Sequence, residues 1–462
     1  MSAHTIDNPF SGDVAVRIET TDGAALGQVL DRAKVAAKAI GAMSIEERVA
    51  LCDRALAKLE ARAEEIAADV TRQMGKPLAQ ARGEIRGTAE RWRHMQAIAR
   101  ECLADVVLEP KDNFERRIVK APLGVVLDLP AWNYPLLTAV NAIVPAVLAG
   151  NAVVVKHSPR TPLCATHFAR AFEEAGAPAG AVSAIFLDYE ATERLVGDER
   201  IDGVLFTGSV LGGHKIQAAA KDRFVPVGLE LGGNDPAYAA EDCDLEKTVE
   251  NVVDGAIYNA GQSCCAVERV YVHKNVYDRF VAAAEPLVRA YVIGDPLDEK
   301  TTLGPVAQPW HPKELEAFVA NAVAKGAKLV AGSGKPVQVN GKGRFFEATM
   351  LTGVPQDADL MTKESFGPIL AIAPVDSDED ALARMNASRL GLTASVWTKD
   401  KERAARMARD LEFGTVYMNR CDALDPALPW TGWKDSGRGA TLSRLGFDGL
   451  TRPKAIHFRL AL

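Results

Sequence analysis

The sequence lacks the features that mark membrane, secreted and metal-dependent proteins. No stretch approaches 18 uninterrupted apolar residues, so we expect no membrane span. The first residues, MSAHTIDNPFSG, lack the basic and apolar regions of a secretory signal peptide. There is no CxxC or HExxH motif and the eight histidines are dispersed, so we expect no metal site.

Charge and cysteine usage narrow the class of protein further. The formal net charge of −7 provides no general basic surface, so we expect no nucleic-acid partner. Seven cysteines, an odd and scattered set, are typical of reduced thiols and of a cytoplasmic protein. The 462 residues, of which 48 % are apolar and 25 % charged, allow two or three domains with a large core.

The first hundred residues are predicted to be helical. Residues 22–103 are rich in alanine, and Ser44-Ile45-Glu46-Glu47 has the pattern of a capping box at a helix start. Apolar side chains then follow at spacings of three and four, which places Cys52 on a core-facing helix stripe. Residues 104–121 are predicted to form a polar strand pair.

From residue 122 onward, short β-rich runs alternate with helical segments. The first runs are GVVLDLP, NAVVVKHS, AVSAIFLD and GVLFTGS, and the later ones are RVYVHK (269–274), PILAIAPVD (368–376), TASVWTKD (393–400) and FGTVYMNR (413–420). This alternation predicts two α/β domains with parallel sheets that bind ligands at the carboxyl ends of their strands. The tail AIHFRLAL (455–462) is predicted to be one more strand, with no obvious partner in the chain.

The stretch NAGQSCCAVERVYV (259–272) places two adjacent cysteines between a small polar turn and an apolar strand. A thiol that projects from such a turn into a cleft could act as a nucleophile. The alternative, which is commoner for a cysteine taken alone, is that both are small buried core residues.

Three other segments carry polar groups suited to the same chemistry. Glu230, in LELGGNDP, ends a strand beside two glycines and could act as a general base, although alone it could be a helix cap or a loop charge. Asn133, in PAWNYP, could donate its amide to an oxyanion. FTGSVLGG (206–213) joins a strand to a helix start, a geometry that presents backbone N–H groups to a phosphate, although it is not a GxGxxG fingerprint.

Together these segments resemble the aldehyde dehydrogenase superfamily over essentially the whole chain. PAWNYP, FTGS, LELGG, GQxC, ESFGP (364–368) and WKDSGRG (433–439) occur in the family's order, after Asn8-Pro9 and Gly75-Lys76-Pro77. The resemblance implies an α/β aldehyde dehydrogenase fold in three parts. These are an atypical parallel-sheet cofactor-binding domain (1–103 and 122–230), an α/β catalytic domain (231–439) and a small β oligomerisation element (104–121 and 440–462). In such a homodimer or homotetramer the tail strand would pair with a neighbouring subunit.

The resemblance also implies a role for each matching residue. Cys264 would be the nucleophile and Cys265 a variable neighbour, Glu230 the general base, and Asn133 with the Cys264 backbone N–H the oxyanion hole. Residues implied to bind NAD or NADP are Trp132, Lys156, Ser158, Pro159, Gly208, Ser209, Gly212, Leu231, Glu364 and Phe366. The implied reaction is oxidation of an aldehyde through a thiohemiacetal and a thioester, which water activated by Glu230 then hydrolyses.

Departures from the family pattern bear on cofactor and substrate. Where the family commonly has a carboxylate for the adenosine ribose, this chain has Pro159, flanked in sequence by Lys156, His157 and Arg160. We therefore expect NADP to be accepted, and a strict requirement for NAD would be unexpected. Asn141, Thr431 and Arg420 favour a short polar aldehyde or a semialdehyde, unless these residues lie outside the pocket.

Two other functions compete with the hydrolytic dehydrogenase. A CoA-acylating semialdehyde dehydrogenase would transfer the acyl group to a thiol, but the presence of Glu230 favours water. A non-catalytic protein on the same fold is disfavoured by the intact set of Cys264, Glu230 and Asn133. A further hypothesis is that Cys264 and Cys265 form a disulfide under oxidant, with the alternative that Cys265 is a buried spectator.

Overall fold

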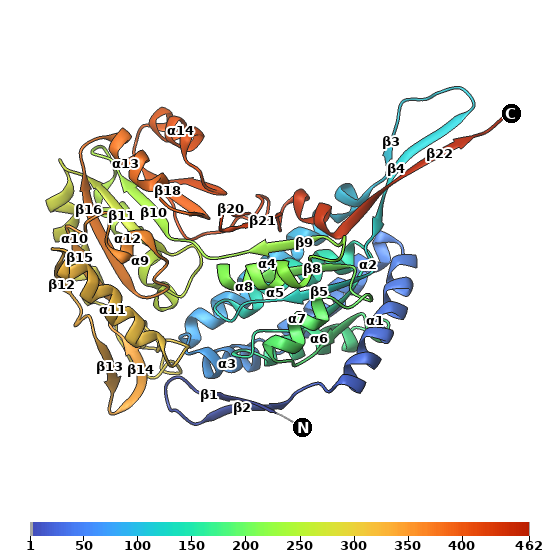
Figure 1. Ribbon diagram of the computed structural model, residues 1–462, viewed down its shortest axis with the longest axis horizontal. Coiled ribbons are helices and arrows are strands. Elements are labelled where there is room, and N and C mark those ends of the chain that lie inside the picture. Colours follow the sequence, from blue (N-terminus) through green and yellow to red (C-terminus); the bar gives the residue numbers. More distant parts are fainter. Residues whose placement is uncertain (1–2, 462) are drawn as a thin grey trace.

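The computed structural model describes residues 3–461, which form two lobes and a projecting arm (Figure 1). An antiparallel hairpin of β1 (Ala3–Asp7) and β2 (Val14–Glu19) comes first, and the sequence did not predict it. Four helices follow, α1 (Gly23–Ala42), α2 (Ile45–Glu60), α3 (Ala63–Met74) and α4 (Leu78–Leu103), which confirms the predicted helical segment. The capping box at Ser44 is present, and Cys52 is fully buried as expected.

The first lobe is built on a six-stranded sheet with the order β21-β9-β8-β5-β6-β7. Its parallel strands are β5 (Val125–Leu129), β6 (Ala152–Val155), β7 (Val182–Ala184), β8 (Gly203–Thr207) and β9 (Val227–Glu230). The helices between them are α5 (Pro135–Leu148), α6 (Leu163–Glu174), α7 (Tyr189–Val196) and α8 (Val210–Ala219). The four predicted strands of this region are confirmed, and β7 is shorter than its apolar run.

A short strand from far along the chain completes this sheet. β21 (Gly437–Arg438) pairs antiparallel with the end of β9, opposite Glu230. The 3₁₀ segment η2 (Arg444–Leu450) follows, and its Phe447 is buried in the core of the first lobe. Residues near the C-terminus therefore lie against the strand that carries Glu230.

The second lobe has a seven-stranded sheet with the order β12-β15-β16-β11-β10-β18-β19. Its strands are β10 (Asp235–Ala239), β11 (Val267–His273), β12 (Lys328–Ala331), β15 (Thr349–Thr352), β16 (Ile369–Val375), β18 (Thr393–Trp397) and β19 (Thr415–Met418). All four predicted runs are strands here. The sequence missed β10, β12 and β15, which are only four or five residues long and have weak β composition.

Helices and short pairings complete the second lobe. The helices are α9 (Leu245–Ile257), α10 (Tyr277–Arg289), α11 (His311–Ala324), α12 (Asp359–Thr362), α13 (Asp378–Asn386) and α14 (Lys401–Asp410), with the 3₁₀ segment η1 (Tyr258–Gly261). β13 (Pro336–Val339) pairs with β14 (Lys342–Phe346), and β17 (Leu390–Gly391) pairs with β20 (Trp433–Lys434). Each lobe has its own buried apolar cluster.

The arm is a three-stranded antiparallel sheet that projects from the first lobe (Figure 1). It consists of β3 (Val106–Val107), β4 (Phe114–Pro122) and β22 (Thr451–Arg459), which confirms the predicted polar strand pair. The prediction that the tail strand lacks a partner in its own chain is wrong, because β22 pairs with β4 from Thr451 opposite Pro122 to Arg459 opposite Phe114. More than 300 residues separate the two strands, so no local pattern indicates the pairing.

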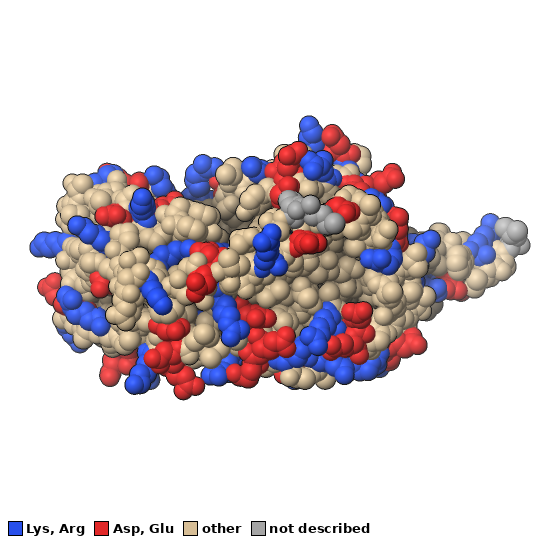
Figure 2. Space-filling view, turned by 90° about the horizontal axis from the view of Figure 1, so that it is seen from below, with Lys and Arg blue, Asp and Glu red and all other residues tan. Residues whose placement is uncertain are grey.

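Lys and Arg are interspersed with Asp and Glu over the face seen in Figure 2, from which the arm extends to one side. Of the helices in residues 3–461, none combines the length and the apolar character needed to cross a membrane.

Candidate active site

One cleft of about 730 Å³ gathers all the residues that the sequence singled out for catalysis and cofactor binding. The first lobe contributes Trp132, Asn133, Lys156, Ser158, Pro159, Gly208, Ser209, Gly212, Glu230 and Leu231, and the second contributes Cys264, Glu364 and Phe366. Most of the first group follows the carboxyl ends of β5, β6, β8 and β9, where parallel sheets present ligand-binding loops.

Cys264 is presented by a turn with unusual backbone geometry. Asn259, Ala260 and Gly261 are consecutive residues with positive φ, of 54°, 56° and 66°. A Cβ on Gly261 would come within 2.0 Å of the Gly367 carbonyl oxygen, so only glycine fits there. The Asn259 side chain donates to the Asn133 carbonyl oxygen at 3.1 Å, which ties the cysteine turn to the predicted oxyanion amide.

Gln262 of the GQxC motif holds this turn in place and is itself buried. Its side chain donates to the Asn259 carbonyl at 3.0 Å and accepts from the Ala307 N–H at 2.8 Å. The glutamine two places before Cys264 therefore has a structural role in this chain.

The two cysteines lie in different surroundings. Cys264 is half-buried and lines the cleft, whereas Cys265 is buried and points away from solvent. The Cys265 thiol donates to Asp422 at 2.9 Å, and Ser263 donates to the same oxygen at 3.1 Å. Contact with Cys264 and burial raise the pKa of Cys265. Cys264 is therefore the thiol that a ligand in the cleft can reach.

Glu230 is held at the end of β9 by two threonines. Its carboxylate accepts from the Thr207 hydroxyl at 3.1 Å and from the Thr441 hydroxyl in a short hydrogen bond. Burial raises the pKa of Glu230, and the two hydroxyls oppose that effect. A carboxyl group with a raised pKa is better suited to take a proton from water near neutral pH. The sequence did not indicate Thr441, which lies 211 residues away.

Asn133 precedes α5, and a buried ion pair anchors the start of that helix. The Glu84 carboxylate accepts from the N–H groups of Leu136 at 2.8 Å and Leu137 at 3.3 Å. The same carboxylate pairs with Lys76, and both side chains are 1 % exposed or less. Sequence reasoning missed this support, although Lys76 belongs to the Gly-Lys-Pro motif.

The turn between β8 and α8 is shaped to receive an anion. Ser209 caps α8 by accepting from the Gly212 N–H at 3.1 Å. A Cβ on Gly208 or Gly212 would approach the Phe206 ring within 2.6 Å, so this ring packs directly against both glycines and leaves no room for a side chain at either position. These features fit the pyrophosphate of a dinucleotide.

Lys156 follows β6 and is a buried cation that faces the cleft. Burial lowers the pKa of Lys156 to about 8, and the charge of Asp188 opposes that shift. Its ammonium lies 5.4 Å from the centre of the Tyr189 ring and forms no ion pair within residues 3–461. An anionic or hydroxyl-bearing ligand would provide the missing partner.

Two of the cations expected near the adenosine ribose are engaged elsewhere. Arg160 lines the cleft, but its guanidinium pairs with Asp7 of the N-terminal hairpin, which also pairs with Arg344. Burial favours the neutral form of Asp7. The hydrogen bonds from Arg344 and Arg160 outweigh this effect of burial and lower the pKa of Asp7 to about 2. His157 is buried against the Pro135 carbonyl at 2.9 Å, and burial lowers its pKa to about 4. His157 and Arg160, which flank Pro159 in sequence, therefore supply no free positive charge to the cleft, whereas Lys156 remains available.

Glu364 and Phe366 close the other side of the cleft. Glu364 accepts from the Gly233 N–H at 3.0 Å, and burial raises the pKa of Glu364. Phe366 meets Trp132 edge to face, with ring centres 5.6 Å apart. The buried Glu268 accepts from the Ser365 and Phe366 N–H groups and so holds this loop.

The three residues expected to shape the substrate pocket behave differently from one another. Asn141 is buried and lines a small cavity whose wall includes Glu230 and Thr441. Thr431 instead donates to the Gly439 carbonyl at 2.7 Å, and Arg420 is exposed. Only Asn141 therefore supports the expected polar pocket.

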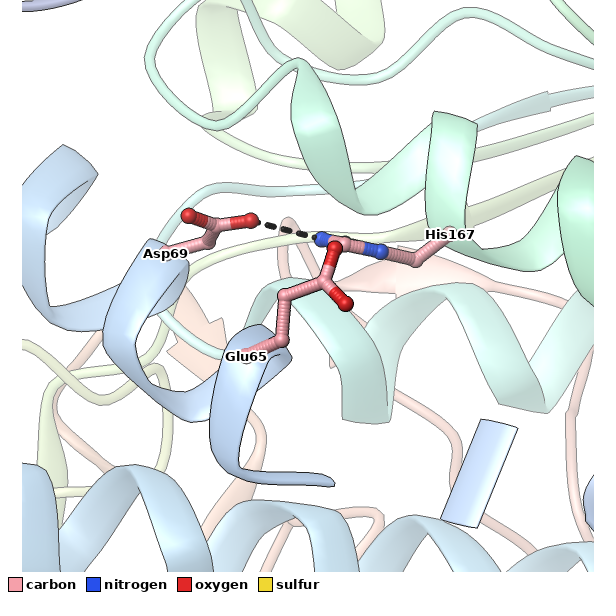
Figure 3. A group of neighbouring side chains, drawn as sticks. All are labelled: Glu65, Asp69 and His167. Atoms are coloured by element: carbon pink, nitrogen blue, oxygen red, sulfur yellow. Dashed lines mark hydrogen bonds and ion pairs between the residues drawn. The ribbon is translucent and has the colours of Figure 1, made fainter. Parts of the chain in front are cut away.

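One group of side chains in the described part of the chain has a composition that could hold a metal ion (Figure 3). Glu65 and Asp69 of α3 face His167 of α6, and their ligand atoms lie within 4.8 Å of one another. His167 and Asp69 already hydrogen-bond at 2.9 Å, and the Arg72 guanidinium lies 3.9 Å from Asp69. The adjacent positive charge and the internal hydrogen bond favour a structural contact between the helices.

Comparison with known proteins agrees with this geometry. The model of the aldehyde dehydrogenase family matches residues 2–456. An aldehyde dehydrogenase of Paenarthrobacter nicotinovorans is 36 % identical over 99 % of both chains. A succinate-semialdehyde dehydrogenase (NADP⁺) of Deinococcus radiodurans is 33 % identical over 97 % of this chain and 93 % of that one. The structure of lactaldehyde dehydrogenase from Escherichia coli superposes with a TM-score of 0.95, at 31 % identity over 99 % of this chain and 96 % of that one. The family and fold class expected from the sequence are thus confirmed, and the chain belongs to the aldehyde dehydrogenase family, enzymes that oxidise aldehydes with NAD or NADP.

Proposed function

We propose that this protein oxidises a short polar aldehyde or semialdehyde to the free carboxylic acid, with Cys264, Asn133 and Glu230 as its catalytic residues. The observation that carries the proposal is that these three side chains line one cleft together with the residues suited to a dinucleotide. Within this cleft Cys264 is the reachable thiol, and Glu230 is a carboxyl group whose pKa is raised by burial.

The chemistry follows from the roles of these residues. The Cys264 thiolate attacks the aldehyde carbon, and the Asn133 amide and the Cys264 N–H donate to the resulting oxyanion. Bound in the cleft, NAD or NADP supplies the acceptor for the hydride that leaves this carbon. The oxyanion collapses to a thioester, and Glu230 then takes a proton from the water that attacks it. The carbon–sulfur bond breaks, which releases the acid and restores the thiolate.

Steady-state assays test the hydrolytic route. The purified protein would be mixed with a panel of aldehydes and either NAD⁺ or NADP⁺, with and without CoA, and reduced cofactor followed at 340 nm. We expect turnover without CoA and free acid as the product. A strict requirement for CoA would instead support an acylating enzyme, and no turnover with any aldehyde would support a non-catalytic protein.

We also propose that NADP is accepted. Pro159 lines the cleft and has no charge that would repel a 2′-phosphate, and Lys156 lies on the same wall without an ion-pair partner in the described chain. The name of the Deinococcus relative, which includes NADP⁺, supports the same proposal. Pro159→Glu should shift kcat/KM toward NAD⁺. A wild-type preference for NAD⁺ above about a hundredfold, roughly 2.7 kcal/mol, would contradict the proposal.

The arm supports a homodimer or homotetramer. Val107 and Phe458 on it are 77 % and 52 % exposed, and β22 and β3 are edge strands. Exposed edges of this kind are usually covered by another chain. Light scattering at micromolar concentration tests this, since a monodisperse monomer would contradict it.

Two further predictions stand as proposals. The domain division is that the cofactor-binding part is 1–103 and 122–230, the catalytic part is 231–439, and the oligomerisation element is 104–121 and 440–462. The separate sheets of the two lobes and the arm support it, with the qualification that β21 and η2 pack against the first lobe. Seven free cysteines support a reducing compartment such as the cytoplasm.

A further inference from the structure

Arg91 lies on α4 and reaches the helix that follows the oxyanion turn. Its Nη1 donates to the Leu137 carbonyl oxygen at 3.3 Å and to the Asn141 side-chain oxygen at 3.1 Å. Both acceptors belong to α5, whose first turn comes directly after Asn133. Asn141 also lines the small cavity beside Glu230. Two hydrogen bonds on one nitrogen thus hold the guanidinium between α4 and the catalytic region.

No carboxylate pairs with Arg91 anywhere in residues 3–461. Three other arginines of the same helix have carboxylate partners, since Arg82 pairs with Glu64, Arg93 with Glu60 and Arg100 with Glu46, whereas Arg86 forms no ion pair within the described residues either. The Nε and Nη2 groups of Arg91 have no acceptor in the described part of the chain either, because both of its hydrogen bonds use Nη1. Arg91 therefore keeps a free pair of donors.

Arg91 lies near the catalytic residues, because Asn141, which it contacts, lines the small cavity beside Glu230. The side chain is half-buried, and burial lowers its pKa. Nearby negative charges oppose this shift of the Arg91 pKa. The charge of Glu230 has the largest effect, and those of Cys265, Glu84 and Cys264 follow. An enclosed cation without a counterion is costly, and a guanidinium binds a carboxylate in a planar, two-point geometry.

From this arrangement we infer that Arg91 binds a carboxylate carried by the aldehyde substrate, at the end opposite the carbonyl that Cys264 attacks. The inference rests on the proposed function and makes the substrate class an oxo acid, with one aldehyde and one carboxylate group. Asn141 accordingly is a positioning residue, because it holds Nη1 and leaves Nε and Nη2 free to bind the carboxylate.

A competing explanation is that Arg91 influences the catalytic residues of the enzyme and does not contact the substrate. Its charge lowers the pKa of Glu230. In that case the loss of Arg91 would slow the oxidation of every aldehyde to a similar extent. A substrate receptor would instead affect only aldehydes that carry a carboxylate.

The experiment compares two aldehydes that differ in one charge, succinic semialdehyde and its methyl ester. The variants are Arg91→Gln, Arg91→Lys and the control Arg93→Gln, which lies on the same helix but is exposed and pairs with Glu60. We expect Arg91→Gln to lower kcat/KM for the acid by about a hundredfold or more and to leave that for the ester within about threefold. Arg91→Lys should retain part of the preference, and Arg93→Gln should match the wild type.

Binding of succinate, measured by calorimetry without cofactor, gives a second readout that does not depend on turnover. It should be detectable in the wild type and lost in Arg91→Gln. Equal losses on acid and ester, no wild-type preference for the acid, or unchanged succinate binding in Arg91→Gln would each overturn the inference. Oxidation of other aldehydes but of neither test substrate would overturn it and leave the proposed function standing, whereas failure with every aldehyde would overturn the proposed function itself.

Discussion

The buried pair of Lys76 and Glu84 offers a test of how the oxyanion turn is supported. Glu84→Gln keeps the size of the side chain and one acceptor oxygen, but it leaves the Lys76 ammonium without a counterion in a place where neither side chain is more than 1 % exposed. Removing one partner of such a pair costs about 3–5 kcal/mol. Burial already lowers the pKa of Lys76, and the charge of Glu84 is the largest effect that opposes this shift. The other contact of the ammonium is the face of the Tyr134 ring, 3.9 Å from its centre, which carries no counter-charge.

This free energy can be converted into a melting temperature. The entropy of unfolding is about 2 cal/mol/K per residue, or about 1 kcal/mol/K for a chain of 462 residues. We therefore expect the Tm of Glu84→Gln to fall by about 3–5 °C in differential scanning calorimetry. Because Glu84 also holds the Leu136 and Leu137 N–H groups next to Asn133, we expect kcat to fall by about tenfold or more as well.

Two controls separate charge burial from a general packing defect. Lys76→Met combined with Glu84→Gln removes both charges and should recover most of the lost Tm, since a neutral pair of similar volume is well tolerated in a core. Glu64→Gln disrupts an exposed pair with Arg82 and should leave Tm unchanged. An unchanged Tm in Glu84→Gln, or a double variant less stable than the single one, would refute the reasoning.

The remaining predictions concern the chemistry at the cleft. Cys264→Ala should abolish oxidation at 340 nm and Cys265→Ala should retain most of it, because only Cys264 lines the cleft; the reverse result would exchange their roles. Glu230→Gln should give a burst of reduced cofactor in stopped-flow measurements and then stall as thioester accumulates, and unchanged steady-state turnover would remove Glu230 as the base. Thr441→Val removes a hydroxyl that lowers the pKa of Glu230, so that pKa rises and the acid limb of the kcat/KM profile should move to higher pH; an unmoved or lowered limb would contradict this. After mild peroxide, peptide mapping should detect a reversible Cys264–Cys265 disulfide if the redox hypothesis holds, and no linked peptide would dismiss it.

Local sequence patterns predicted the long helices and most strands of the two larger sheets, but they missed the β1–β2 hairpin and the short strands β10, β12 and β15. The capping box at Ser44 and the apolar stripe after it specify α2, because both signals depend on neighbours within one or two helical turns. The short apolar runs specify strands of both parallel sheets for the same reason. The GQxC motif distinguishes Cys264 from Cys265, and the structure agrees, since Cys264 lines the cleft and Cys265 is buried.

Tertiary structure alone decided which charges remain free. The sequence places Arg160 beside the cofactor position, but a partner 153 residues away, Asp7, takes its guanidinium. Arg91 carries no local signal at all, and it matters only because the packing of α4 on α5 brings it to Asn141 and leaves it without a counterion in the described chain. Thr441 donates a hydrogen bond to Glu230 although 211 residues separate them in sequence. β22 pairs with β4 although more than 300 residues separate the two strands. Such contacts depend on how whole helices and sheets pack against one another, and the local spacing of residues along the chain does not predict that packing.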